Sequence, residues 1–187
     1  IRTLKSIENS DVAVILFDAQ IGVDKQDLHI VEATMERHRS ALIAVNKWDL
    51  IEKSTQTARE FELVIIQKLG LYDFLPILFI SAKSKQRLHK VMEKVREIHV
   101  EQCKRIETSV LNKAILPEIQ HYPPKTTSPK EIKIKYVTQI KTRPPMFSFF
   151  CNEPRLVQES YRRFLEHKLR EHFGFSGVPL NLVFKKK

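Results

Sequence analysis

ALIAVNKWD, residues 41–49, is the stretch that decides the fold. Its first five residues, Ala41–Val45, are apolar without a break, which predicts a short strand covered on both faces, as the strands of parallel sheets are. Asn46-Lys47-Trp48-Asp49 follows at once, at the carboxyl end of that strand, where α/β sheets place their ligands. The sequence therefore predicts an α/β unit with a ligand site directly after residue 45.

Apolar runs and segments of helical period alternate over the first hundred residues. The other runs are Val12–Phe17 and Leu75–Ile80, and the helical segments lie near Lys25–His38, Thr57–Leu69 and Gln86–Cys103. This alternation is typical of a doubly wound, mainly parallel sheet. Because only three strands are visible where such sheets usually have five or six, we expect the sheet to be incomplete. The chain opens with Ile1, inside an amphipathic pattern, so we expect it to be a piece of a longer protein.

After Cys103 the pattern changes to that of a small α+β domain with the order α-β-β-α-β. Helices are expected near Thr108–Ile119 and Pro154–Phe173, and strands near residues 131–136, Met146–Cys151 and Leu180–Phe184. A connector rich in Pro, Thr, Ser and Lys, Tyr122–Lys130, precedes the first of these strands. Gly174 is a natural stop for the second helix.

Charge divides the chain in the same way. Residues 1–100 hold 15 Lys/Arg against 14 Asp/Glu, and residues 101–187 hold 17 against 8, a net charge of +9. Such a basic unit most often meets a polyanion, because Lys and Arg neutralise phosphates and release counterions. A solvated surface that binds nothing is the alternative.

Other classes of protein are disfavoured by composition. Cys103 and Cys151 have neither CxxC spacing nor clustered histidines, so we expect no metal site and no disulfide framework. The longest apolar runs are about six residues, against the ~20 that span a bilayer, so we expect no membrane segment. We therefore place the chain in the reducing cytoplasm.

Asn46-Lys47-Trp48-Asp49 resembles the NKxD motif by which P-loop GTPases recognise guanine, and the resemblance implies a role for each residue. The Asp49 carboxylate would accept both the ring N–H and the exocyclic amine of guanine, a donor pair that adenine lacks. Lys47 would lie along the base, and Asn46 would tie together the loops that frame it. Ser81-Ala82-Lys83 ends the next apolar run and resembles the SAK element of these GTPases, which implies that one of its backbone N–H groups meets the guanine carbonyl oxygen. The alternative is an ordinary strand-to-helix turn with Asp49 as a cap.

These motifs resemble the second GTPase domain of the Der/EngA family of tandem GTPases. Further segments carry the resemblance through the rest of the chain: Asp18-Ala19-Gln20-Ile21-Gly22, Lys141-Thr142-Arg143-Pro144-Pro145, Ser160-Tyr161-Arg162-Arg163-Phe164-Leu165 and residues 173–180. The resemblance implies the second half of a P-loop GTPase sheet in residues 1–104 and a KH-like domain in residues 105–187. It also implies a bacterial, cytoplasmic, GTP- and GDP-binding factor for assembly of the large ribosomal subunit. Its expected partners are ribosomal RNA and the protein's own GTPase domains.

The departures from the family pattern concern phosphate chemistry. None of the four glycines is followed by Lys-Ser or Lys-Thr, so the phosphate-binding loop is absent from this sequence, and Asp18 is followed by glycine four residues on rather than three. Without these elements phosphoryl transfer has no machinery here. We expect no catalytic residue in this chain, no GTP hydrolysis by it alone, and Mg²⁺ binding only together with a phosphate-binding half. The alternative function is a non-catalytic RNA- or ribosome-binding adaptor with a vestigial nucleotide domain.

Candidate RNA contacts follow from the basic character of the second part. They are Lys133, Lys135, Lys141, Arg143, Arg162, Arg163, Lys185, Lys186 and Lys187. Arg162 and Arg163 also stand at helical ion-pair spacing from Glu166 and Glu159, so contact of this pair with RNA and simple helix pairing are weighed equally. Gly174-Phe175-Ser176-Gly177 fits the GXXG letters of a KH loop, but we interpret it as a helix stop and turn. We expect Phe147, Phe149 and Phe150 to be core residues rather than platforms for bases.

Overall fold

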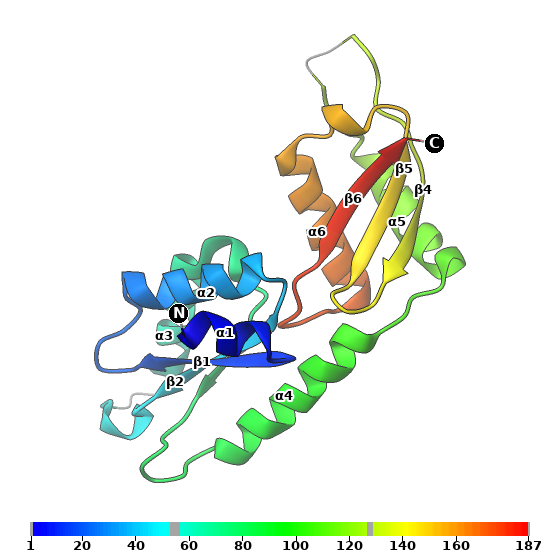
Figure 1. The fold of residues 1–187 in the computed structure, drawn as a ribbon. Coiled ribbons are helices and arrows are strands. Elements are labelled where there is room, and N and C mark those ends of the chain that lie inside the picture. The colour runs from blue at the N-terminus through cyan, green and yellow to red at the C-terminus, as the bar shows by residue number, and fades with distance from the viewer. Residues whose placement is uncertain (1, 53–56, 127–128, 187) are drawn as a thin grey trace. The chain divides into compact units, whose positions relative to one another are not determined.

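The computed structural model describes residues 2–52, 57–126 and 129–186. It divides into two compact units, which are treated separately: unit 1 comprises Ile1–Glu101 and Ser176–Pro179, and unit 2 comprises Gln102–Phe175 and Leu180–Lys187. The elements of unit 1 are α1 (Arg2–Glu8), β1 (Val12–Asp18), α2 (Lys25–Glu36), β2 (Ser40–Asn46), α3 (Thr57–Leu69), β3 (Ile77–Phe79) and α4 (Leu88–Cys103), whose last two residues belong to unit 2 (Figure 1).

The three strands of unit 1 form a parallel sheet in the order β1-β2-β3, which confirms the predicted α/β pattern. β2 is the central strand, and Ala41–Val45 are at most 2% exposed. Burial on both faces is why this segment reads as an unbroken apolar run. Asp18 and Asn46 are register partners at the carboxyl ends of β1 and β2, so the last residues of these two strands stand side by side.

β1 differs from β2, because only one of its faces is covered. Ile15 and Phe17 are buried, but Val14 is 41% and Leu16 is 58% exposed. Among the described residues β1 pairs with β2 alone, and it lies at an edge of the sheet. The apolar run is therefore half open to solvent, because no described element covers its second face.

A short piece of chain from far along the sequence belongs to unit 1. In the segment Ser176–Pro179, the carbonyl of Gly177 accepts the N–H of Ala41 at 2.8 Å, and its own N–H donates to the carbonyl of Phe74 at 2.9 Å. Gly177 thus continues the hydrogen bonding of the sheet at the amino end of β2. Its partner in the GXXG letters, Gly174, ends α6 with a bond to the Arg170 carbonyl, and the reading as a helix stop and turn is confirmed.

Unit 2 has the predicted order α-β-β-α-β. Its elements are α5 (Thr108–His121), β4 (Ile134–Lys141), β5 (Met146–Cys151), α6 (Glu159–Phe173) and β6 (Asn181–Lys186). β4 pairs antiparallel with β5, and β5 pairs parallel with β6. α5 and α6 lie together behind this sheet in the view of Figure 1, and the face toward the viewer carries no helix of the unit.

Two boundaries in unit 2 differ from the sequence prediction. Pro154–Leu156 forms a separate 3-10 turn, and the extended backbone of Val157 interrupts it, so α6 begins at Glu159 rather than at Pro154. The first strand begins at Ile134 and contains a register shift before Tyr136. Simple alternation therefore fails there, since the bulge places Ile134 and Tyr136 on opposite faces.

The core of unit 2 lies between the helices and one face of the sheet. Its fully buried side chains include Leu111, Ile115, Val137, Phe147, Phe149, Leu165 and Leu169. Phe147 and Phe149 are core residues as predicted. Phe150 is not, because successive side chains of a strand point to opposite faces and Phe150 shares a face with Tyr136 instead.

Candidate functional site

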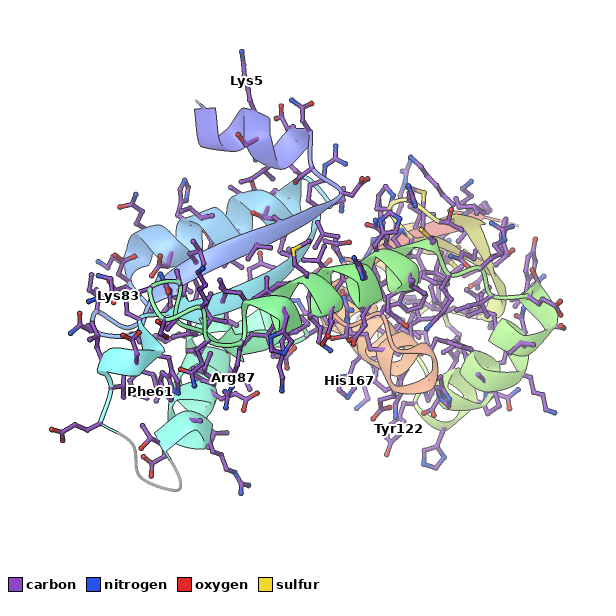
Figure 2. The ribbon with its side chains drawn as sticks, turned by 90° about the horizontal axis from the view of Figure 1, so that it is seen from below. Lys5, Phe61, Lys83, Arg87, Tyr122 and His167 are labelled. Carbon is purple, nitrogen blue, oxygen red and sulfur yellow. The ribbon has the colours of Figure 1, made fainter. Side chains whose placement is uncertain are left out.

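The carboxyl ends of the three strands of unit 1 bring the predicted guanine-site residues together. β1 ends at Asp18, β2 at Asn46, and β3 is followed two residues later by Ser81. Ile80 continues the pairing by donating its N–H to the carbonyl of Val45 at 2.9 Å. Figure 2 shows Lys83 in the turn after β3, at the same end of the unit as Phe61 of α3. The site is thus an edge of the sheet built from three separate segments.

Asn46 ties two of these segments together. Its side-chain Oδ1 accepts the backbone N–H of Ala82 at 2.9 Å, and its backbone carbonyl accepts the N–H of Ala19 at 2.9 Å. The structure therefore places Asn46 in the bridging position that was expected of it, with its side chain on the loop after β3.

Lys47 is held by an ion pair. Its Nζ lies 2.6 Å from Oδ2 of Asp18, and the hydrogen bond from Lys47 is the first cause of a lowered pKa at the Asp18 carboxyl. Oδ1 of Asp18 accepts the N–H of Gln20 at 2.9 Å, so both carboxylate oxygens are engaged. The backbone of Lys47 is left-handed, with φ of 61°, which turns the chain sharply at the end of β2.

Asp18 was not among the predicted site residues, although its role was accessible from the sequence. It is the first polar residue after the apolar run of β1, as Asn46 is after β2. Because the carboxyl ends of parallel strands meet at one sheet edge, residues in these equivalent positions lie together. Comparing strand ends, rather than searching for motifs, would have selected it.

Trp48 anchors the motif in the core. It is 4% exposed, and its ring lies 4.3 Å from that of Phe79 and 5.2 Å from that of Phe61, measured between centroids. Its N–H donates to the carbonyl of Ile80 at 3.0 Å. Lys47 and Asp49, on either side, are exposed. The buried indole thus fixes a turn whose two charged neighbours face outward.

The turn after β3 is closed by its own serine. Ser81 is fully buried, and its Oγ accepts the N–H of Ser84 at 3.1 Å, while its N–H donates to the carbonyl of Gln86. Ala82 and Lys83 remain exposed. The N–H of Ala82 already donates to Asn46. The next backbone N–H along the exposed part of the turn is that of Lys83.

These residues present groups that could contact a planar base at one edge of the sheet. A carboxylate at Asp49, a lysine stem and backbone amides suit a planar base with paired N–H donors and a carbonyl. Among the described residues, no group of three or more His, Cys, Asp or Glu side chains is placed to hold a metal. Nor is any helix of the described chain long and apolar enough to cross a bilayer.

The predicted RNA contacts are scattered over unit 2 and differ in their surroundings. Lys133 pairs with Glu131 at 3.3 Å, and the Arg143 guanidinium contacts the Cys103 thiol at 2.7 Å. Arg162 and Arg163 both lie near Glu159, and the Arg162 guanidinium sits 4.7 Å from the Phe184 ring centre. The exposed lysines are Lys133, Lys135, Lys141, Lys185 and Lys186, and Lys187 lies outside the described residues.

Comparison with known families gives two matches that together span the chain. Residues 2–101 match the elongation factor Tu GTP binding domain. Residues 105–185 match the KH-domain-like of EngA bacterial GTPase enzymes, C-terminal. The boundary between the matches falls near the end of α4, close to the division between the two units.

Two solved structures show a distant likeness. Era in complex with MgGDPNP and nucleotides 1506–1542 of 16S ribosomal RNA has a TM-score of 0.45 and 15% identity, covering 98% of this chain and 67% of its own. The apo form of translation elongation factor SelB from Methanococcus maripaludis has a TM-score of 0.47 and 14% identity, covering 81% of this chain and 30% of its own. Likenesses of this size carry no functional argument.

Curated relatives are much closer. GTPase Der of Chloroherpeton thalassium is 47% identical over all 187 residues, and that of Pelodictyon phaeoclathratiforme is 45% identical. In both cases the chain spans 43% of the relative's length. With both family matches in order and this identity over its whole length, the chain belongs to the Der/EngA family of GTPases.

Proposed function

We propose that this chain supplies guanine recognition and RNA docking to a GTP-binding factor for assembly of the large ribosomal subunit. The observation that carries the proposal is the bond from Ala82 N–H to Asn46 Oδ1, which joins the two loops expected to frame the base. A strand-to-helix turn serving only the fold has no need to be bound to the next loop along the sheet. The proposed location is the bacterial cytoplasm.

The base would be selected by charge and geometry at the exposed end of the sheet. Asp49 accepts the two N–H donors of guanine, and an amide in the turn Ser81-Ala82-Lys83 donates to its carbonyl oxygen. The Lys47 stem, held by Asp18, lies along the ring. Adenine presents neither that donor pair nor that carbonyl, so it leaves Asp49 unsatisfied.

Hydrolysis of GTP is proposed only for a protein that also contains a phosphate-binding half. This sequence has no Gly-Lys-Ser or Gly-Lys-Thr, and hence no loop that cradles the phosphates and supplies a hydroxyl for Mg²⁺. The residues described here therefore bind and orient the base and take no part in the phosphoryl step. Mg²⁺ supplies charge neutralisation at the phosphates when that half is present.

Unit 2 is proposed to dock on ribosomal RNA of the large subunit. Residues 101–187 carry the net charge of +9, and five of the candidate lysines are exposed. Phosphate contacts of this kind bind without reading sequence and position the protein on its target. The protein's own GTPase domains are the second proposed partner of this unit.

Ligand-detected NMR with GMP, AMP and XMP tests base recognition directly in this chain. We expect millimolar or weaker affinity, since the phosphates are unheld, with GMP bound more tightly than AMP. Asp49→Asn should reduce GMP binding at least tenfold or so and raise the relative affinity for XMP, because the amide reverses one of the two contacts. Asp73→Asn, an exposed carboxylate after α3, is the matched control.

Two results would count against the proposal. Equal binding of GMP and AMP by the unaltered chain would leave an adaptor with a vestigial nucleotide domain as the better account. Tight, Mg²⁺-dependent GTP binding or measurable turnover by these 187 residues would show that the phosphate site is present after all.

A further inference from the structure

The turn between β3 and α4 carries a run of cations. Lys83, Lys85 and Arg87 occupy alternate positions in it, and all three are exposed. Figure 2 labels Lys83 and Arg87 on this turn, which leads directly into α4. The sequence contains no acidic residue between Asp73 and Glu93. These three residues, the basic turn, therefore concentrate positive charge at one place on unit 1, although residues 1–100 as a whole hold nearly equal numbers of cations and acids.

No carboxylate neutralises the basic turn. Among the described residues, no ion pair joins any of its three cations to an aspartate or glutamate, whereas other cations of unit 1, such as Arg37 and Lys94, pair with glutamates. Like charges held close together repel each other and oppose the compact state. A bound anion would relieve that repulsion.

The backbone of the basic turn is also unfavourable for the residues that occupy it. Lys85 has a φ of 58° and Arg87 a φ of 59°, both in the left-handed region. Glycine adopts this conformation without the penalty that a side chain brings. A turn that served only the fold would therefore suit glycine at either position, and strained residues of this kind gather where they serve a function.

The turn is nevertheless well ordered at its base. The N–H of Ser81 donates to the Gln86 carbonyl at 3.2 Å, and the N–H of Ser84 donates to the Ser81 Oγ at 3.1 Å. The N–H of Ala82 donates to Oδ1 of Asn46 at 2.9 Å. The three exposed cations thus stand on a fixed backbone, which lowers the entropy lost when they bind a partner.

The surroundings of the three cations favour a phosphate backbone as that partner. No large apolar side chain of residues 82–90 is exposed. The centre of a protein interface is rich in aromatic side chains, and a segment that lies on a lipid surface needs apolar anchors, so neither partner fits. Ser84 and Gln86 stand between the cations, and their side chains, like those of Lys and Arg, commonly bond to phosphate oxygens.

We propose that the basic turn is a surface of unit 1 that binds the phosphates of RNA. Phosphate contacts carry no sequence information, so it takes any RNA strand. The turn would present its backbone to the guanine base and its side chains to RNA. This inference rests on the proposal that the chain meets RNA, and it goes beyond the docking of unit 2 because it gives unit 1 a contact of its own.

Lysine footprinting on the full chain locates the RNA. The probe is an oligouridine of about 16 nucleotides, and mass spectrometry measures the acetylation rate of each lysine with and without it. With the RNA at about ten times its dissociation constant, Lys83 and Lys85 should react roughly tenfold more slowly, because most of the chain is bound. Lys5 and Lys25, exposed lysines of α1 and α2, should react at unchanged rates.

Glycine substitutions separate binding from folding. The double variant Lys85→Gly, Arg87→Gly removes two charges and suits the left-handed backbone, so it should stay folded, which thermal melting checks. Its slope of log affinity against log salt for the same RNA should be flatter by about 1.4. Lys25→Ala with Arg59→Ala removes the same charge from exposed positions of α2 and α3 and should leave the slope unchanged. Neither variant should alter GMP binding.

The outcomes separate this inference from the proposed function. Protection of Lys141, Lys185 and Lys186 without protection of Lys83 and Lys85 would overturn the basic turn as an RNA contact and leave the docking of unit 2 intact. An unchanged salt slope in the folded glycine variant would overturn it as well. A loss of GMP affinity in that variant as large as its loss of RNA affinity would assign the cations to the nucleotide's own phosphate. Absence of any RNA binding would defeat both proposals.

Discussion

The Nζ of Lys47 and the Oδ2 of Asp18 lie 2.6 Å apart and join the end of β2 to the end of β1. Lysine is a flexible side chain with rotamer freedom that is lost when it lies along a base. A carboxylate that holds it in place before the base arrives lowers that cost. Asp18 would therefore contribute to guanine binding without touching the base.

Asp18→Asn should weaken GMP binding by several-fold, because an amide keeps the size of the side chain and loses its charge. In a double-mutant cycle, the variant with both Asp18→Asn and Lys47→Met should bind GMP only slightly more weakly than the variant with Asp18→Asn alone. Asp11→Asn makes the same change just before the amino end of β1, and it should leave GMP binding unaltered. If Asp18→Asn bound GMP as well as the unaltered chain, the pair would be a surface contact only.

Gly177 and Gly22 provide a matched pair for the packing of Ser176–Pro179 in unit 1. Both have positive φ, +73° and +76°. A Cβ at Gly177 would meet the Ala41 carbonyl oxygen at 2.7 Å and the Ile98 Cδ1 at 2.8 Å, whereas at Gly22 it would meet nothing within 4 Å. Gly177→Ala should therefore lower the free energy of unfolding by about 3 kcal/mol, and Gly22→Ala by about 1 kcal/mol.

Trp48 makes this measurement specific to unit 1. It is the single tryptophan of the chain and is 4% exposed, so its fluorescence in a urea titration reports the unfolding of that unit. Equal unfolding midpoints for the two alanine variants would mean that Gly177 does not pack against Ala41 and Ile98 as described.

Sequence reasoning names candidate site residues most readily where neighbours in the chain carry the expected chemistry. Asn46, Lys47 and Asp49 are adjacent, and a single buried strand positions all three. It missed Asp18, because no motif contains it and only a comparison of the two strand ends relates it to Asn46. The motif predicted that Asn46 would join the two loops, but only the structure identifies the hydrogen bond from the Ala82 N–H to the Asn46 Oδ1.

In unit 2 the order of helices and strands was predictable from the sequence. Which residues of each strand share a face of the sheet was not. A single register shift between Ile134 and Tyr136 changes which residues of β4 share a side, and nothing in the alternating pattern marks it. Phe150 was misassigned to the core for a related reason. Five of the six residues Met146–Cys151 are hydrophobic, so composition does not say which of them point inward.

A charge cluster between α5 and α6 should give unit 2 a defined pH dependence. Lys168 Nζ lies 3.2 Å from Glu118 and 2.7 Å from Glu171. The contact with His172, and after it the contact with Lys168, lowers the pKa of Glu118, and Lys168 lowers the pKa of Glu171. The two carboxylates in turn raise the pKa of Lys168. A carboxyl whose pKa is lowered by folding stabilises the fold at every pH above its ordinary pKa. This stability is lost as the pH falls through the lowered pKa of the folded state. The raised pKa of Lys168 stabilises the fold below the ordinary pKa of lysine, and this stability is lost as the pH rises through the raised pKa of the folded state.

Lys168→Met should accordingly destabilise unit 2 at pH 7, and the difference from the unaltered chain should shrink as pH falls well below 4.5. Urea unfolding followed by far-UV circular dichroism at several pH values measures it. Lys113→Met, an exposed lysine on α5, should show little effect at any pH. A loss of stability for Lys168→Met that is the same at pH 3 and pH 7 would indicate packing of its stem rather than charge.

The exposed side chains of Val14 and Leu16 on the edge strand β1 should make this chain prone to associate when it is alone. Leu16→Lys should reduce self-association in sedimentation velocity, because a charge on an edge strand opposes pairing with a second chain. Leu63→Lys, at a similarly exposed leucine of α3, should change association less. A monomer at all concentrations without either substitution would contradict the prediction and show that the open face of β1 is harmless in solution.

Salt dependence should show that unit 2 binds RNA mainly through phosphates, and the structure refines which cations matter. Lys133 and Arg143 are engaged by Glu131 and Cys103, so the exposed Lys141, Lys185 and Lys186 are the better candidates. Each phosphate-contacting lysine replaced by alanine should flatten the slope of log affinity against log salt for single-stranded RNA by about 0.7.

The triple alanine variant at these three lysines should therefore lose about two units of slope, together with much of its affinity at low salt. The control replaces Lys5, Lys25 and Lys90, three exposed lysines of unit 1, and removes the same net charge. General attraction between a basic protein and RNA would reduce binding equally in both variants. A local contact reduces the slope only in the first, because counterions are released from the phosphates that a lysine actually meets.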